Sequence, residues 1–405
     1  MAGNNNPKYL TPDIIAKEAM AIFHQKAVLL PKLNTDYDKY FAKVGQKIGK
    51  KLRIERPMKF LVREGEIMET NDIEQLSDEF TVATLRGVDL EFSTTDLTMT
   101  IDNFKTKFLD KAMMRLVTAV ESDLMRMILQ VPAVVNNLTS KLTYDAVLEA
   151  GQILDEALVP TDRTAILTPK DRKNLIIDTK TLFNNSTEIG KQYKTGRMGE
   201  SMGVEFFEST LLRAYTSGVA ASATTYNTGV AVTANGSTSV TCTAAAPANA
   251  FRRGDSITFA GVTALHPEEL NDTGILKPFV VTEDYVGGAA PGNTIKFLPA
   301  IYTSGPYQNV PAAGIPNSAA ITKLGGANAV LRPSVIFAKD AFSVVSAKME
   351  IDKAMAWASS VYHDGIGIRV WRGSDIRTNR ILNRLDVLYG YKTLNPEYAV
   401  RIHSL

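Results

Sequence analysis

Charge disappears from the sequence between Arg213 and Arg252, in a stretch rich in Thr, Ser, Ala and Gly, although 22% of all residues are charged. Short runs of Val, Ile, Phe and Thr begin there and continue to about residue 326, separated by Gly, Pro and Asn. Runs spaced roughly 10–20 residues apart, with turn signals between them, are typical of a small antiparallel barrel or sandwich. We therefore expect a β domain inserted at 217–326 into an α+β host. Its predicted strands are Val230–Val232, Ser239–Thr243, Ser256–Ala260, Phe279–Glu283 and Thr294–Leu298.

Composition limits the possible functions. The 405 residues allow two or three hydrophobic cores. A net charge of only +2 argues against a protein that grips nucleic acid phosphates tightly. The single cysteine, Cys242, cannot form an internal disulfide, which fits a reducing cytosol. No basic-then-apolar leader and no apolar run of about 20 residues occurs, so neither a signal segment nor a membrane anchor is expected.

The host begins with an amphipathic helix. Thr11-Pro12 predicts its start, and Ile15, Ile22 and Phe23 fall on one face. This face must pack against something, either the body of the same chain or a neighbouring subunit.

A long β-excursion follows at residues 50–98, which we call the arm. Apolar and charged residues alternate from Leu52 to Val62, and a returning strand or pair of strands is predicted between Phe80 and Phe92. The arm is either a solvated two-stranded flap or an extension that reaches another subunit. In the second case the predicted contact residues are Arg53, Glu55, Arg56, Lys59, Arg63, Glu64 and Glu66 on the arm, with Ile15, Ile22 and Phe23 on the helix.

The strongest periodic signal follows the arm. Apolar residues keep a spacing of three or four from Ile101 to Val131, and Pro132 ends the run. This pattern predicts one helix of about 45 Å at 1.5 Å per residue. Beyond it, helices are predicted from Tyr144 to Leu158 and from Thr168-Pro169 to about Asp178. Strands are predicted at 164–167, 204–208, 333–337, 367–371, 385–391 and 399–402.

No convincing active site is present. Gly199-Glu200-Ser201-Met202-Gly203 matches the hydrolase nucleophile elbow, but a polar segment precedes it and a strand follows it, which inverts the required context. The four histidines have no metal-ligand spacing. Arg253-Gly254-Asp255 is expected to be a tight turn that opens a strand. We therefore predict no catalytic residues, no cofactor and no metal.

The order of these segments resembles the Hong Kong 97-type major capsid proteins of tailed phages: a helical arm, a long β-excursion, one extended helix, an α/β domain and closing strands. The sequence from Arg253 to Val262, RGDSITFAGV, and the closing segments Gly365–Ile368, Arg369–Asp375, Leu385–Tyr391 and Asn395–Glu397 resemble the coat protein of the short-tailed Salmonella phages. That coat protein carries a β-barrel insertion domain.

The resemblance implies a domain for each part of the chain. These are an N-terminal arm (1–49), an E-loop (50–98), a peripheral domain with the spine helix (99–142), an axial domain in two parts (143–216 and 327–364), the inserted barrel (217–326), and C-terminal strands that close the domains (365–405).

The same resemblance implies a major capsid protein that is not an enzyme and that self-assembles as hexamers and pentamers into an icosahedral head around double-stranded DNA. Its implied partners are a scaffolding protein, a portal protein and possible decoration proteins, with DNA contacted non-specifically and no membrane. The implied location is the virion, after assembly in the host cytoplasm. Two alternatives remain open at this stage: an encapsulin-like nanocompartment, and a serine hydrolase that uses Ser201.

Overall fold

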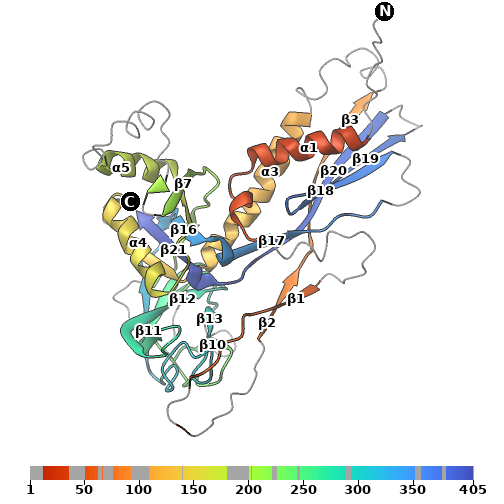
Figure 1. Ribbon diagram of the computed structural model, residues 1–405. Helices are drawn as coiled ribbons and strands as arrows, with labels where there is room; N and C mark the ends of the chain where they lie inside the picture. The colour runs from red at the N-terminus through yellow and green to blue at the C-terminus, as the bar shows by residue number, and fades with distance from the viewer. Residues whose placement is uncertain are drawn as a thin grey trace, which may run out of the picture. The chain divides into compact units, whose positions relative to one another are not determined.

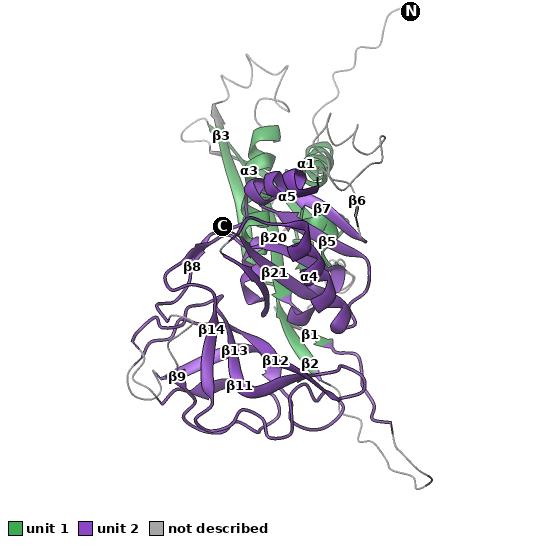
Figure 2. Ribbon diagram, turned by 90° about the vertical axis from the view of Figure 1, so that its left-hand side faces the viewer, with its two compact units in different colours: residues 1–54, 77–124, 343–392 green, residues 55–76, 125–342, 393–405 purple. Residues whose placement is uncertain are grey.

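The computed structural model describes the chain as two compact units. Unit 1 comprises residues 1–54, 77–124 and 343–392, and unit 2 comprises residues 55–76, 125–342 and 393–405 (Figure 2). The described residues are 12–35, 51–62, 66, 76–93, 109–138, 140–179, 200–201, 203–220, 226–243, 247–287, 293–351, 357–375 and 380–404.

Unit 1 is a sheet covered by two helices, α1 (Pro12–Lys26) and α3 (Asp110–Leu124). The sheet has the order β17-β20-β19-β18, and β3 also pairs with β20 (Figure 1). The helix α1 packs against α3, β18 and β19. A separate ribbon joins β1 to β2 at the base of the arm. The strands are β1 (Lys51–Glu55), β2 (Ser77–Thr81), β3 (Thr84–Ser93), β17 (Phe342–Ser346), β18 (Ala358–His363), β19 (Ile366–Asp375) and β20 (Arg380–Thr393).

The helix α3 occupies the centre of the predicted long helix. Its buried residues keep the expected spacing at Met113, Leu116, Val117, Val120 and Leu124. The chain then tightens into the 3-10 helix η5 (Met125–Gln130) before Pro132. Residues 101–108 of the prediction lie outside the described part. The helix was thus predicted correctly from 110, and the change to 3-10 geometry in its last turns was missed.

The host part of unit 2 is a mixed sheet with the order β4-β21-β16-β5-β7-β6. The strand β21 (Ala399–Ser404) runs parallel to β4 (Ala133–Asn137) and antiparallel to β16 (Ser334–Ala338). Apolar residues of α4 (Tyr144–Glu156) and α5 (Pro169–Thr179) share a core with this sheet. The remaining strands are β5 (Arg163–Leu167), β6 (Glu200–Ser201) and β7 (Val204–Glu208). These elements confirm the strands and helices expected between 144 and 208 and the strand near the C-terminus.

The inserted segment forms a six-stranded antiparallel sheet, ordered β10-β13-β12-β11-β14-β9. Phe259, Phe279 and Phe297 are fully buried, with ring centroids 5.1–5.6 Å apart, and form the centre of its core. The strands are β9 (Tyr226–Asn227), β10 (Ser237–Thr241), β11 (Ser256–Leu265), β12 (Asp272–Val281), β13 (Thr294–Ile301) and β14 (Ala320–Leu324). Two short strands pair where the chain enters and leaves this segment, β8 (Tyr215–Thr216) and β15 (Val330–Leu331).

Some details of the insert differ from the sequence prediction. The predicted strand Val230–Val232 is reduced to an isolated bridge between Val232 and Ile315, and β9 and β14 were not predicted. The first and last strands of the sheet are also connected, because Gly229 N donates to Thr241 O (2.7 Å) and Thr243 N donates to Asn227 O (2.9 Å).

Candidate assembly surfaces and buried polar clusters

The first half of the arm exposes large apolar side chains. Phe60 is 62% exposed and Val62 is 95% exposed, and Met58 and Leu61 are also exposed, at 44% and 41%. Within the described residues 51–62, β1 forms a strand and residues 56–62 continue without regular structure. Neighbouring exposed apolar residues of this kind are typical of a surface that another molecule covers.

The charged residues predicted on the arm are mostly on its surface. Arg53, Glu55, Lys59 and Glu66 are exposed and Arg56 is half-buried, whereas Arg63 and Glu64 lie outside the described residues. At the base of the arm, Arg53 Nε donates to Ser77 Oγ (2.5 Å), and Lys51 pairs with Glu79 (2.7 Å). Solvent screens exposed contacts of this kind, so they contribute more to the choice of partner strand than to stability.

Within unit 2, residues 55–62 contact the inserted sheet. Lys59 Nζ donates to Pro267 O (3.2 Å), and Tyr307 Oη donates to Pro57 O (3.0 Å). Nearby, Glu397 pairs with Lys277 of β12 (2.5 Å). The pKa of the Glu397 carboxyl is lowered by Lys277 first, and also by Lys59 and Arg56. Residues 55–62 of the arm are therefore attached to the insert of the same chain.

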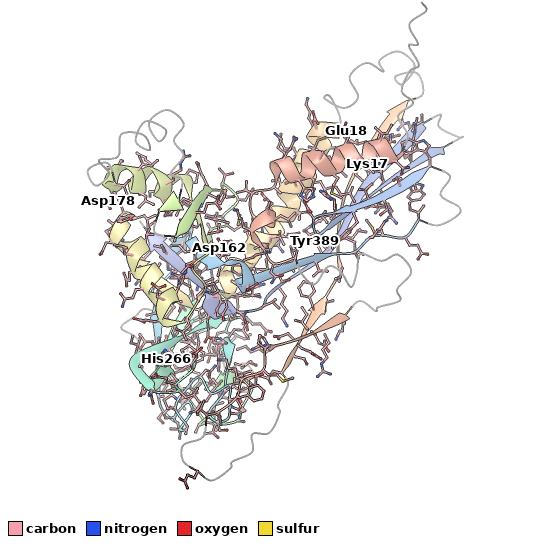
Figure 3. All side chains as sticks on the ribbon, in the orientation of Figure 1. Lys17, Glu18, Asp162, Asp178, His266 and Tyr389 are labelled. Atoms are coloured by element: carbon pink, nitrogen blue, oxygen red, sulfur yellow. The ribbon has the colours of Figure 1, made fainter. Side chains whose placement is uncertain are left out.

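The apolar residues predicted for contact on the N-terminal helix lie inside unit 1. Ile15, Ile22 and Phe23 are all less than 10% exposed, in the face of α1 that packs on α3 and the sheet. Of the two partners left open by the sequence, α1 therefore packs against the body of its own chain. Its outer face carries Lys17 and Glu18 (Figure 3).

Two buried carboxylates near the end of α3 hold separate segments of unit 1. The Glu121 carboxylate accepts backbone N–H groups of Val28 and Leu29, the latter at 2.8 Å. Burial raises the pKa of Glu121, although these backbone hydrogen bonds oppose the rise. Asp123 Oδ2 accepts from Arg86 Nη2 (2.7 Å) and from the Tyr389 hydroxyl (2.8 Å). The helix thus fastens the chain after α1 through Glu121, and β3 and β20 through Asp123.

A third buried polar cluster lies in unit 2, where the insert joins the host. It contains Tyr215, Asp255, Lys323, Arg401 and His403, and the side chains of all five are almost entirely buried. The Tyr215 hydroxyl is 3.5 Å from His403 Nε2. Burial, with a smaller contribution from Arg401, lowers the pKa of His403 to about 3.

This shift predicts that unit 2 becomes less stable in acid. Between the unfolded pKa of about 6.5 and the folded value of about 3, the unfolded chain binds a proton that the folded chain excludes. The free energy of unfolding should therefore fall by a few kcal/mol as pH decreases from 6.5 toward 4. We expect His403→Gln to flatten this dependence in urea titrations followed by circular dichroism. An equal slope in wild type and His403→Gln would contradict the assignment.

The remaining motifs carry no chemistry. Ser201 lies in β6, which pairs antiparallel with β7 and does not sit at a strand-to-helix turn. The prediction for Arg253-Gly254-Asp255 is confirmed, since Asp255 N donates to Arg252 O (2.9 Å) and β11 begins at Ser256. Among the described residues, no group of three or more His, Cys, Asp or Glu side chains could hold a metal ion. In the same part of the chain, no helix is long and apolar enough to cross a bilayer.

Comparison with known proteins decides the family. Residues 14–402 match the family described as "P22 coat protein - gene protein 5". The chain belongs to the P22 coat protein family. It is therefore a phage coat protein, a structural subunit of a virion head shell, and not an enzyme. No curated protein sequence matches the chain.

Solved structures were compared with the chain at the level of fold. A structure titled "Mycobacterium phage Che8" has a TM-score of 0.51 at 12% identity, covering 93% of this chain and 90% of that one. "Capsid structure of the Cyanophage P-SCSP1u" has a TM-score of 0.45 at 12% identity, covering 88% and 84%. The first of these supports a shared mixed α+β fold.

Proposed function

We propose that the chain is a Hong Kong 97-type subunit that tiles an icosahedral head as hexamers and pentamers around double-stranded DNA. The observation that carries this proposal is the run of exposed apolar side chains from Met58 to Val62 on the arm. A monomer in water gains nothing from this exposure, whereas a neighbouring copy that covers the run removes it from solvent.

In this proposal each segment has the role implied by the resemblance. Residues 1–49 form the N-terminal arm, 50–98 the E-loop, 99–142 the peripheral domain, 143–216 and 327–364 the axial domain, and 365–405 the closing strands. The exposed charges at Arg53, Glu55, Lys59 and Glu66 set the register between copies. Since Ile15, Ile22 and Phe23 are buried in their own unit, they act in intersubunit contact only if α1 leaves it.

We further propose that residues 217–326 form a closed barrel. The two hydrogen bonds between the segments 227–229 and 241–243 support closure, because they connect the two ends of the six-stranded order. The barrel has its own core around Phe259, Phe279 and Phe297. It is therefore able to bury apolar surface without help from the host.

Removal of residues 218–325 is expected to leave an aggregation-prone chain. The deletion removes the partner of Arg401 in β21 and the surface that residues 55–62 contact. Size-exclusion chromatography and electron microscopy of the deletion variant test this expectation. A soluble variant that assembles normal shells would refute the role of the insert.

The proposed partners are a scaffolding protein, a portal protein and possible decoration proteins. Electron microscopy of the expressed protein, with and without a co-expressed scaffolding protein, tests the central proposal. Closed particles are expected with the scaffold present. A strictly monomeric product at high concentration would overturn the proposal, and enzyme cargo in place of DNA inside native particles would favour a nanocompartment.

A further inference from the structure

The two points at which the chain enters and leaves the inserted sheet are held together by hydrogen bonds, and we call this place the root of the insert. The chain enters through Gly218 and leaves through Gly326. Lys323 Nζ donates to Gly218 O (2.7 Å) and to Gly326 O (2.9 Å). Asp255 Oδ2 accepts from Gly218 N (2.8 Å) and from Arg252 N (2.9 Å). Both side chains belong to the insert, and both residues are only 1% exposed.

Arg401, a residue of the host sheet, also reaches this root. Arg401 of β21 is fully buried, and its Nη1 donates to Gly254 O (2.8 Å) in the turn that precedes β11. Its guanidinium also lies 5.9 Å from the ring centroid of Tyr215, in the short strand that leads into the insert. Arg401 therefore contacts both the entry strand and the first turn of the inserted sheet.

The position of Arg401 in the host sheet makes this contact rigid. The strand β21 lies between β4 and β16, and Arg401 is in register with Val134 and Val335. Its neighbours Val400 and Ile402 pack into the core shared with α4, so strand alternation directs Arg401 to the opposite face. A second bond supports that face, because Ser256 Oγ donates to Pro132 O (2.6 Å) just before β4.

The buried charges at the root indicate that this cluster fixes the orientation of the inserted sheet more than it stabilises the fold. Two buried cations, Lys323 and Arg401, face one buried carboxylate, Asp255. Burial lowers the pKa of Lys323 and raises that of Asp255. Apolar residues of similar volume often stabilise a buried site as well as an ion cluster does, so net stability alone does not account for these charges.

We propose that Arg401 is a positioning residue that locks the inserted sheet onto the host sheet, and that the lock forms only once β21 has been added between β4 and β16. Because β21 follows every other described strand in the sequence, the insert is able to fold first and becomes oriented last. This coupling is independent of shell formation.

Hydrogen exchange on the purified full-length protein tests the lock. In Arg401→Met, the amides of Gly218, Arg252 and Gly254 should exchange about a hundredfold faster than in wild type, because removing one member of a buried charged cluster opens its neighbours. Amides of β12 and β13 beside Phe279 and Phe297 should change by less than about threefold. Arg332→Met removes an exposed arginine beside β16 and should change neither set.

If Arg401→Met is insoluble, Arg401→Lys replaces it, since lysine keeps the charge and a single donor group. We then expect about tenfold faster exchange at the same three amides. Unchanged exchange at the root would overturn the proposal. So would equal acceleration throughout the inserted sheet, because Arg401 would then support folding and not orientation. Neither result depends on whether particles form.

Discussion

Replacing Phe60 and Val62 together by serine should abolish closed particles while leaving the subunit folded. The two side chains are 62% and 95% exposed, so their loss should change the free energy of unfolding by less than about 0.5 kcal/mol. Burial of a phenylalanine at a contact contributes about 2 kcal/mol, and every subunit of a shell repeats that contact. Electron microscopy and sedimentation velocity measure the loss of particles, and circular dichroism measures the retained fold.

The insert supplies a matched control for this experiment. Val230 and Val286 are 62% and 70% exposed, yet each is isolated from other exposed apolar residues along the chain. The double variant Val230→Ser with Val286→Ser should therefore assemble as wild type does. A normal particle yield from the arm variant would exclude the exposed run on the arm as an assembly surface.

Asp123→Ala should destabilise unit 1 by about 3 kcal/mol. The substitution leaves the buried hydroxyl of Tyr389 without its acceptor and removes the ion pair with Arg86, whose pKa Asp123 raises. Both tryptophans of the chain, Trp357 and Trp371, belong to unit 1, so tryptophan fluorescence during urea unfolding reports on this unit alone.

Two further variants separate the causes of the Asp123 effect. Asp123→Asn keeps an acceptor for Tyr389 and should recover part of the loss. Asp89→Ala removes a carboxylate on β3 that is 77% exposed, and it should cost less than about 0.5 kcal/mol. Equal destabilisation by Asp89→Ala and Asp123→Ala would contradict the special role of the buried carboxylate.

The sequence predicted the elements whose signals are local. The three-to-four spacing of Met113, Leu116, Val117 and Val120 identified α3, because a helix buries one face whatever it packs against. The uncharged stretch and its Val, Ile and Phe runs identified the insert in the same way. Val230–Val232 failed because β-propensity depends on a partner strand, and here only Val232 finds one, in Ile315.

The buried polar clusters could not be predicted, since their partners lie far apart in the chain. In the sequence, Glu121 is indistinguishable from any polar residue of an amphipathic helix. Its carboxylate nevertheless accepts the backbone N–H groups of Val28 and Leu29, more than 90 residues away. Arg401 is one charged residue in a short predicted strand, and its hydrogen-bond acceptor, Gly254 O, is 147 residues away. Only the topology brings such groups together, and no periodicity in the sequence encodes it.

The two carboxylates of α3 restrict how unit 1 is able to rearrange. Glu121 and Asp123 are two residues apart on one helix, and each grips a different part of the chain with bonds shorter than 3 Å. Sliding α3 along its axis by one residue, about 1.5 Å, would break the hydrogen bonds of both carboxylates in the same step. The helix α3 is therefore not expected to shift gradually by itself. Either the segments bound by Glu121 and Asp123 move together with the helix, or the hydrogen bonds of both carboxylates break in the same step.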